Sequence, residues 1–289
     1  MLKALLKTMR PRQWHKNVFV FAALVFDEKL FQFNALARTV VAFALFCLIS
    51  STVYIVNDVM DREQDRQHPV KRLRPIPAGR LPVSVALAAA ALFVLFGLPL
   101  AFLLDWRFGA TILTYLILQV AYSISLKHVV IVDVLAISAG FVLRVVGGTF
   151  VISVERFSPW LYVCMTLLSL FLAIGKRRHE VILLRGNANT HRPVLDDYTV
   201  RFLDEMIALV TSTTVVAYSL YTFSAPNLPA NHSMMLTIPF VIYALFRYLY
   251  LIHVREEGGA PDELVLKDRP LLISVLLWGA AVITVLYWS

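Results

Sequence analysis

The sequence has little of what marks a disulfide-linked or a nucleic-acid-binding protein. It contains two cysteines, Cys47 and Cys164, which lie inside apolar runs, have no nearby partner and lack the spacing of metal ligands. We therefore expect two buried thiols and no disulfide framework. There is also no basic patch with interleaved aromatic residues, so the net charge of +8 does not indicate binding to nucleic acid.

Charged residues are scarce as well, at 16% of the chain, whereas hydrophobic residues make up 59%. Soluble domains rarely exceed about half apolar residues. Long apolar runs without alternation predict an all-α, polytopic bundle of membrane helices, because lipid offers the backbone no hydrogen-bond partner. We expect nine spans, at residues 17–33, 36–56, 83–104, 108–126, 130–153, 159–175, 204–223, 235–252 and 271–288.

The basic residues are distributed unevenly over the two sides of this bundle. Nine spans place 21 of the 27 Lys and Arg residues in the N-terminal segment and in the loops after the even-numbered spans. Since cytoplasmic segments carry the excess of Lys and Arg, the N-terminus is predicted to be cytoplasmic in an inner-membrane protein. The two long loops, residues 57–82 and 176–203, then both face the cytoplasm, and we expect the active site there.

The N-terminal segment has no small-residue cleavage site of the kind that ends a signal peptide. Leu2, Leu5, Leu6 and Met9 recur at helical spacing among basic residues. Two interpretations remain open, a short amphipathic helix on the membrane surface and a frayed basic tail.

Acidic side chains gather where the second span reaches the cytoplasm. Asn57, Asp61 and Asp65 are spaced by four residues, so a helix places them on one face, and Asp58 borders that face. Clustered oxygen ligands of this kind suit Mg²⁺, which bridges carboxylates and substrate phosphates. The alternative is a solvated helix end at which Arg62 and Arg66 pair with the acids.

A basic segment, K-R-L-R-P-I-P-A-G-R at residues 71–80, follows the acids. Its prolines and Gly79 predict a rigid turn. Lys71, Arg72 and Arg74 beside bound Mg²⁺ make a suitable cradle for a diphosphate. The alternative is the ordinary positive charge of a cytoplasmic loop.

These two segments resemble a known family. The pattern N-D-x-x-D-x-x-x-D, followed by R-P-x-x-x-G, is similar to the first aspartate-rich motif of the UbiA superfamily of intramembrane prenyltransferases. Y-S-I-S-L-K at residues 122–127 resembles another element of that family. The resemblance implies a single transmembrane domain over residues 1–289, with nine helices around a central cavity.

One segment departs from the ordinary prenyltransferases, which carry a second aspartate-rich motif after the sixth span. Here K-R-R-H-E occupies residues 176–180, so base replaces acid and a bare phosphate is favoured over a metal-bound diphosphate. This segment, R-P-R-Q-W-H-K-N at residues 10–17, Asp133 and the H-R-P-V-L segment at 191–195 with Tyr198 resemble the decaprenyl-phosphate phosphoribosyltransferase branch.

That branch implies the substrates 5-phosphoribosyl 1-diphosphate and a polyprenyl phosphate, release of pyrophosphate, dependence on Mg²⁺ and a role in cell-envelope biosynthesis. It implies metal ligands at Asn57, Asp58, Asp61 and Asp65, and catalytic roles for Asp58, Asp61 and Lys16. The expected substrate-binding residues are Asn17, Lys71, Arg72, Arg74, Tyr122, Lys127, Arg144, Lys176, Arg177, Arg178 and Glu180. An oligomer is left open.

Arg144 needs a separate explanation, because it falls about 14 residues into a span and thus about 20 Å deep. An arginine at that depth needs a partner or a polar cavity. It either lines the central cavity or pairs with an acid on another span.

Two other functions remain to be distinguished. A prenyltransferase that attaches an isoprenoid chain to an aromatic acceptor shares the first acidic motif but requires the second. A transporter requires charges near the bilayer midplane, whereas the acids here gather at one end of a span.

Overall fold

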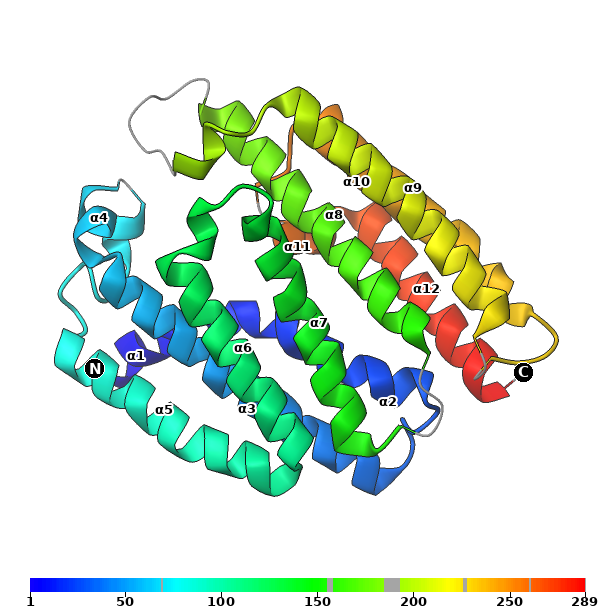
Figure 1. The fold of residues 1–289 in the computed structure, drawn as a ribbon, viewed down its shortest axis with the longest axis horizontal. Coiled ribbons are helices and arrows are strands. Elements are labelled where there is room, and N and C mark those ends of the chain that lie inside the picture. Colours follow the sequence, from blue (N-terminus) through cyan, green and yellow to red (C-terminus); the bar gives the residue numbers. More distant parts are fainter. Residues whose placement is uncertain (69, 155–157, 185–192, 226–227, 260, 289) are drawn as a thin grey trace. The chain divides into compact units, whose positions relative to one another are not determined.

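The computed structural model describes residues 1–289 apart from 69, 155–157, 185–192, 226–227, 260 and 289. Every regular element within these residues is a helix, as Figure 1 shows. In this part of the chain, eight helical segments are long and apolar enough to cross a membrane. The predicted all-α class is therefore confirmed.

These eight segments coincide, apart from their ends, with the last eight of the nine predicted spans. They are α3 (Phe33–Met60), α5 (Val83–Leu104), α6 (Trp106–Ile124), α7 (Val132–Ile152), α8 (Pro159–Leu184), α9 (Val200–Ser224), η5 with α10 (Ser233–Thr237 and Ile238–His253) and α12 (Arg269–Trp288). Short elements complete the chain: α4 (Arg62–Gln67), η2 (Lys71–Leu73), η3 (Leu126–His128), η4 (Pro193–Leu195) and α11 (Pro261–Lys267).

The first predicted span has a different structure from the others. It consists of a 3₁₀ helix, η1 (Pro11–Phe21), followed by the short helix α2 (Ala22–Phe26). Proline at the first helical position has the backbone torsion that a helix needs, which is why the element starts earlier than predicted. Glu28 lies just beyond α2 with φ +56°. The count of nine crossings stays a prediction.

The N-terminal segment is a helix, α1 (Leu2–Thr8), and not a frayed tail. Leu5 and Met9 pack in a hydrophobic cluster with Ile76 of the basic segment and with Leu81, which directly follows that segment. Leu2 and Leu6 of the same helix are 71% and 44% exposed. The segment is therefore helical, and α1 supports the turn that follows the acidic residues. Its place on the membrane surface stays a prediction.

The second predicted loop begins later than expected, because α8 continues without a break through Leu184. The K-R-R-H-E segment therefore lies on helix and not in a loop. Lys, Arg and Glu are good helix formers, and Val181 extends the buried face beyond them. Residues 185–192 of the predicted loop, which include His191 and Arg192, lie outside the described residues.

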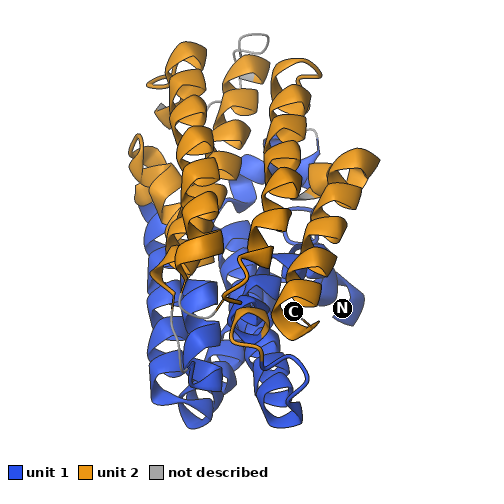
Figure 2. Cartoon of the chain, turned by 90° about the vertical axis from the view of Figure 1, so that its right-hand side faces the viewer, with its two compact units in different colours: residues 1–24, 29–125, 143–154 blue, residues 25–28, 126–142, 155–289 orange. Residues whose placement is uncertain are grey.

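The chain contains two compact units, coloured in Figure 2. Unit 1 comprises residues 1–24, 29–125 and 143–154, and unit 2 comprises residues 25–28, 126–142 and 155–289. The division falls within α7, whose first half belongs to unit 2 and whose second half belongs to unit 1. The single domain and the central cavity stay predictions.

The core of unit 1 forms around Phe46 of α3, whose ring packs edge-on against the rings of Phe108 and Tyr115 on α6. Glycines let the second half of α7 approach this core closely. A Cβ atom at Gly148 would lie 2.1 Å from the backbone oxygen of Val20 in η1. Contact between η1 and α7 therefore requires glycine at this position.

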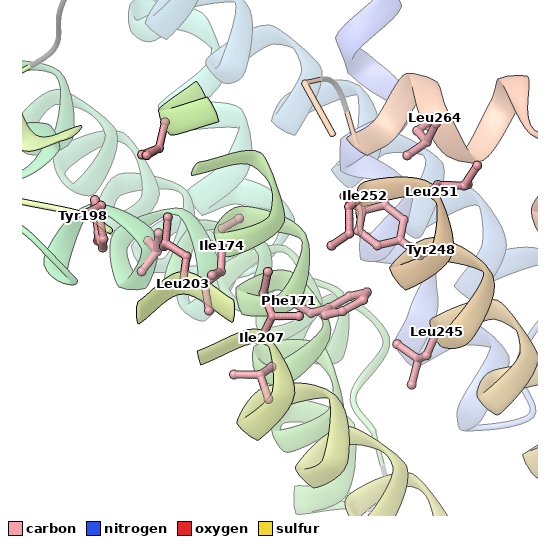
Figure 3. Close-up of a cluster of buried hydrophobic side chains, with 14 of the residues drawn as sticks. Phe171, Ile174, Tyr198, Leu203, Ile207, Leu245, Tyr248, Leu251, Ile252 and Leu264 are labelled. Atoms are coloured by element: carbon pink, nitrogen blue, oxygen red, sulfur yellow. The ribbon is translucent and has the colours of Figure 1, made fainter. Parts of the chain in front are cut away.

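The core of unit 2 is shown in Figure 3. The Phe171 ring of α8 lies 5.0 Å from the Tyr248 ring of α10, and Leu203 and Ile207 of α9 are fully buried in the same cluster. This cluster also contains Tyr198. The polar end of α8 is therefore built on a closely packed hydrophobic base.

Candidate functional site

The aspartate-rich segment is helical but interrupted once. Asp61 has left the helical conformation, with φ −86° and ψ 7°, where α3 ends and α4 begins. Backbone hydrogen bonds from Asp61 to Asn57 (2.9 Å) and from Asp65 to Asp61 (2.8 Å) continue the helical register across this break. The predicted face is therefore present, bent at Asp61, with Asn57 partly buried.

Asp58 and Asp65 converge on one guanidinium group. Nη1 of Arg74 lies 3.2 Å from Oδ1 of Asp58 and 2.6 Å from Oδ2 of Asp65, and both aspartates are 2% exposed. Lys71 adds an ammonium group 3.8 Å from Asp65. The basic segment is thus folded onto the acidic one, while Arg72 is exposed.

Arg10 is a member of this cluster that the predicted site residues do not include. Its guanidinium donates a hydrogen bond to Oδ1 of Asp58 and lies 5.1 Å above the Tyr54 ring. Arg10 has φ +53° immediately before η1, a left-handed conformation that is uncommon outside glycine. The available signal was an arginine directly before the proline that starts a helix.

The two arginines of the acidic segment itself contact its exposed acid, Glu63. Arg66 makes two 3.1 Å contacts with Glu63, and Arg62 also contacts Glu63. Asp58 and Asp65, by contrast, are buried and contact Arg10, Arg74 and Lys71, so these two acids are not part of a solvated helix end.

The donor chemistry of this cluster is compatible with Mg²⁺. Among the described residues, no three acidic, His or Cys side chains surround one point. Mg²⁺ commonly binds one or two protein carboxylates and completes its shell with water and substrate phosphates. Asp58 and Asp65, which already converge on one cationic group, satisfy that requirement.

A second polar cluster in unit 1 joins Asn17 to Arg144. Nε of Arg144 donates to Oδ1 of Asn17 (2.8 Å), and Nη2 donates to the hydroxyl of Tyr115 (2.9 Å), whose ring also lies 4.8 Å from the guanidinium. Asn17 in turn donates to Ser50 at 3.2 Å. The sequence left open whether Arg144 pairs with an acid on another span. The partners that the structure gives it include the amide of Asn17 and the phenol of Tyr115.

Asn17 also lies deeper than the sequence suggested. Because η1 starts at Pro11 and a 3₁₀ helix rises about 2.0 Å per residue, Asn17 is about 12 Å along this element and not at its entrance. It is 1% exposed, and Lys16 beside it is partly buried. Asn17 holds η1 against α3 and α7, and its direct contact with a substrate stays a prediction.

The basic end of α8, in unit 2, separates into residues with different surroundings. Lys176 has a half-exposed side chain, 3.9 Å from Glu180. Arg177 is 1% exposed, 2.5 Å from Asp133, and also paired with Glu180. Of these two cations, Lys176 is the one accessible to a phosphate.

Arg178 is also committed to contacts within unit 2. It lies 2.6 Å from Asp204 of α9 and donates to the backbone oxygen of Ile252 in α10 at 3.0 Å. A buried arginine with these partners joins three helices. This is a structural explanation for a residue that the sequence placed in the substrate site.

Asp133 and Tyr198 complete the network around Arg177. The Tyr198 hydroxyl donates to Oδ1 of Asp133 and accepts from the backbone N–H of Ile131, both at 2.7 Å. Burial and the hydrogen bond to Asp133 raise the pKa of Tyr198, so its hydroxyl remains a donor. The predicted site residues included neither group; the signal available was the pair of segments that resembled the phosphoribosyltransferase branch.

Tyr122 and Lys127, from the Y-S-I-S-L-K element, lie on either side of the end of α6. Tyr122 belongs to unit 1 and Lys127, in η3, belongs to unit 2. Both side chains are partly buried. Although only five positions separate them in the sequence, the two residues pack within different units.

The regular elements of the described residues are all helices, eight helical segments are candidate spans, and one of these spans ends in a buried aspartate–arginine cluster. This combination is typical of one class of membrane enzyme. The model of the UbiA prenyltransferase family matches residues 18–266, so the chain belongs to this family and is a multi-pass membrane protein. The family membership predicted from the sequence is confirmed.

Within this family, the chain is similar to proteins of a particular kind. The decaprenyl-phosphate phosphoribosyltransferase of Corynebacterium glutamicum is 33% identical over 98% of this chain and 86% of its own length. The enzyme of the same name from Mycolicibacterium smegmatis is 34% identical over 100% of this chain and 94% of its own length. The resemblance to this branch is therefore confirmed over nearly the whole chain.

Solved structures agree with the fold. A UbiA homologue from Archaeoglobus fulgidus bound to DMAPP and Mg²⁺ has a TM-score of 0.74 and 18% identity, and each chain is covered to 99%. The same homologue bound to GPP and Mg²⁺ has a TM-score of 0.75. At this level of identity, the likeness establishes the fold alone.

Proposed function

We propose that this chain transfers a 5-phosphoribosyl group from 5-phosphoribosyl 1-diphosphate to a polyprenyl phosphate and releases pyrophosphate. The observation that carries the proposal is the unequal charge of the two motif segments. Carboxylates converge at Asp58 and Asp65, whereas residues 176–180 contain three consecutive cations, of which Lys176 is exposed. The names of the similar enzymes, decaprenyl-phosphate phosphoribosyltransferases, agree with this assignment.

The donor diphosphate is assigned to unit 1. Asp58, Asp61 and Asp65, with Asn57, would hold Mg²⁺, which when bound neutralises charge on the leaving diphosphate. Arg74 and Lys71 lie against the same carboxylates and would orient the diphosphate oxygens through charged hydrogen bonds. The bond from ribose C1 to the diphosphate breaks, and stabilisation of that leaving group is the main task of the site.

The acceptor requires little activation from the protein. A lipid phosphate oxygen is already anionic, so it forms the new bond to ribose C1 without losing a proton to a base. Lys176, with its half-exposed side chain, and Lys127 are assigned to substrate phosphates. The active site is assigned to the cytoplasmic side of the inner membrane because its residues lie in or beside the basic segments, and an excess of Lys and Arg is typical of cytoplasmic segments.

The proposal is tested by supplying purified protein in detergent with radiolabelled 5-phosphoribosyl 1-diphosphate, Mg²⁺ and a short polyprenyl phosphate. We expect a labelled, organic-extractable lipid that is not formed in the presence of EDTA. Absence of labelled lipid would refute the assignment. A product formed instead from a prenyl diphosphate and an aromatic acid would establish the prenyltransferase alternative.

Asp61→Ala supplies the matching variant. It should abolish turnover, because Asp61 is a proposed metal ligand. The protein should still insert and elute as a single species, because Asp61 is partly exposed and lies between α3 and α4. Glu63→Ala, which removes an exposed carboxylate two residues away, is the control and should retain activity. A near-normal rate for Asp61→Ala contradicts its assignment to the metal.

A further inference from the structure

The segment between α6 and α7 contains a strained turn. Ile131 has φ +68°, and the N–H of Val132 bonds to the carbonyl of Val130 at 2.8 Å. A hydrogen bond across two residues around a positive φ is the pattern of the classic γ-turn, which is rare and strained. For a β-branched residue this conformation is a true outlier.

Such a turn persists only where its surroundings enforce it. Here the Tyr198 hydroxyl accepts the N–H of Ile131 at 2.7 Å and donates to Asp133, two residues further on, at the same distance. Tyr198 is 3% exposed and Asp133 is fully buried. One side chain thus bonds the backbone of the turn and the first turn of α7.

Asp133 is itself held in place from α8. Its second oxygen accepts a hydrogen bond from Arg177 (2.5 Å), which also pairs with Glu180. All of these residues belong to unit 2. The network therefore connects the basic end of α8 to the γ-turn through Tyr198 and Asp133.

Lys127 lies four residues before Ile131, in η3, and η3 also contacts η4, the element that precedes Tyr198. We propose that Tyr198 is a positioning residue, which holds the γ-turn at Ile131 and thereby places Lys127 to bind a phosphate of one substrate. The identity of the phosphate that Lys127 binds rests on the proposed function. The ordering of the turn by Tyr198 does not.

The test compares two tyrosines that each make two buried hydrogen bonds through the hydroxyl. Tyr198→Phe removes the bonds to Ile131 and Asp133. Tyr218→Phe, the matched control, removes bonds to Thr237 (2.6 Å) and Trp278 (2.7 Å) elsewhere in unit 2. Both variants lose the same atoms, so a general loss of stability appears in both.

In Tyr198→Phe, amide hydrogen exchange of residues 129–132 should become faster. KM for one phosphorylated substrate should rise about tenfold, whereas kcat should change less than about twofold. Tyr218→Phe should change neither. Combining Tyr198→Phe with Lys127→Ala should raise KM no further than Lys127→Ala alone, because the tyrosine acts through the lysine.

A rescue variant separates positioning from simple loss of stability. Glycine adopts a positive φ without steric cost, so Ile131→Gly in the Tyr198→Phe background should restore most of the KM. Unchanged exchange at residues 129–132 overturns the proposal whatever the activity. Faster exchange with unchanged KM for both substrates also overturns it. If amide exchange at residues 129–132 becomes faster in Tyr198→Phe but the wild-type protein shows no phosphoribosyl transfer, the proposed function is refuted. The conclusion that Tyr198 orders the turn then still holds.

Discussion

Arg74 shows how single residues set the chemistry of unit 1. Two buried carboxylates cannot remain charged side by side without a cation, because burial makes an unpaired charge very costly. Arg74 contacts both, and Arg10 and Lys71 each contact one. The acidic and basic segments are therefore one electrostatic unit.

Two neighbouring cations on α8, Lys176 and Arg177, should respond differently to substitution. Lys176→Ala should raise KM for a phosphorylated substrate several-fold and leave stability unchanged, since the side chain is half exposed. Arg177→Ala should lower the melting temperature markedly, because it leaves Asp133 buried without its cation, a loss of about 3–5 kcal/mol. Thermal unfolding and initial rates on both variants check this. Equal melting temperatures would contradict the structural assignment of Arg177.

Asp268 gives a prediction about pH. It caps α12 through the N–H of Leu271 and forms two hydrogen bonds with Arg247, which hold the pKa of this carboxyl below its ordinary value despite partial burial. A lowered folded-state pKa contributes stability at pH values above the ordinary aspartate pKa of about 3.9, and this contribution is lost as the pH falls through the folded value.

The difference in melting temperature between the wild-type protein and Asp268→Asn should therefore be constant from about pH 7 to 5 and shrink below about pH 4. Thermal unfolding in detergent at a series of pH values measures it. Glu263→Gln, which removes an exposed pair with Lys267, is the control for the loss of one carboxylate. A difference that grows on acidification would contradict the direction of the pKa shift.

At the scale of elements, η1 is the unusual component. Runs of 3₁₀ helix longer than three or four residues are uncommon, because their hydrogen-bond geometry is poor, yet η1 has 11 residues. Its stability must come from contacts with its neighbours. Asn17 supplies them through Arg144 and Ser50, and Val20 lies directly against Gly148.

Gly148→Ala tests this joint. The added Cβ would lie 2.1 Å from a backbone oxygen, so η1 or α7 has to move, and overpacking of this kind costs about 1–3 kcal/mol. Gly279→Ala, in α12, is the matched control because nothing lies within 4 Å of its Cβ. We expect a lower melting temperature for Gly148→Ala and an equal or higher one for Gly279→Ala. The reverse order would refute the close contact.

At the scale of the whole molecule, the open quantity is the number of crossings. Eight segments satisfy the length and hydropathy of a span among the described residues, and η1 with α2 occupies the place of the first of the nine predicted spans. Nine crossings put the two ends of the chain on opposite sides of the membrane, whereas eight put them on the same side. The basic segments favour nine.

Cysteine labelling distinguishes the two counts. In a background with Cys47→Ser and Cys164→Ser, Lys3→Cys and Ser289→Cys each carry one thiol near an end of the chain. With a membrane-impermeant maleimide added to spheroplasts, we expect Ser289→Cys to react directly and Lys3→Cys only after permeabilisation. Reaction of both only after permeabilisation would establish eight crossings.

The sequence was sufficient for the helical class, the places of eight spans and the composition of the acidic and basic segments. These follow from hydropathy and from local spacing, which act over a few neighbouring residues. Asp58, Asp65 and Arg74 were predicted correctly as members of one cluster, because their segments are adjacent in the chain. The turn at Gly79 was predicted for the same reason and has φ +72°.

Other features depended on contacts between residues far apart in sequence, which local spacing does not encode. Arg10 meets Asp58 across 48 positions, and Arg144 meets Asn17 across 127. The sequence predicted that Arg177 binds substrate, yet its guanidinium is buried and pairs with Asp133, 44 positions away. Local sequence thus determined which elements form and which charges gather at their ends. Tertiary packing decided which of those charges are enclosed by partners and which stay accessible to a substrate.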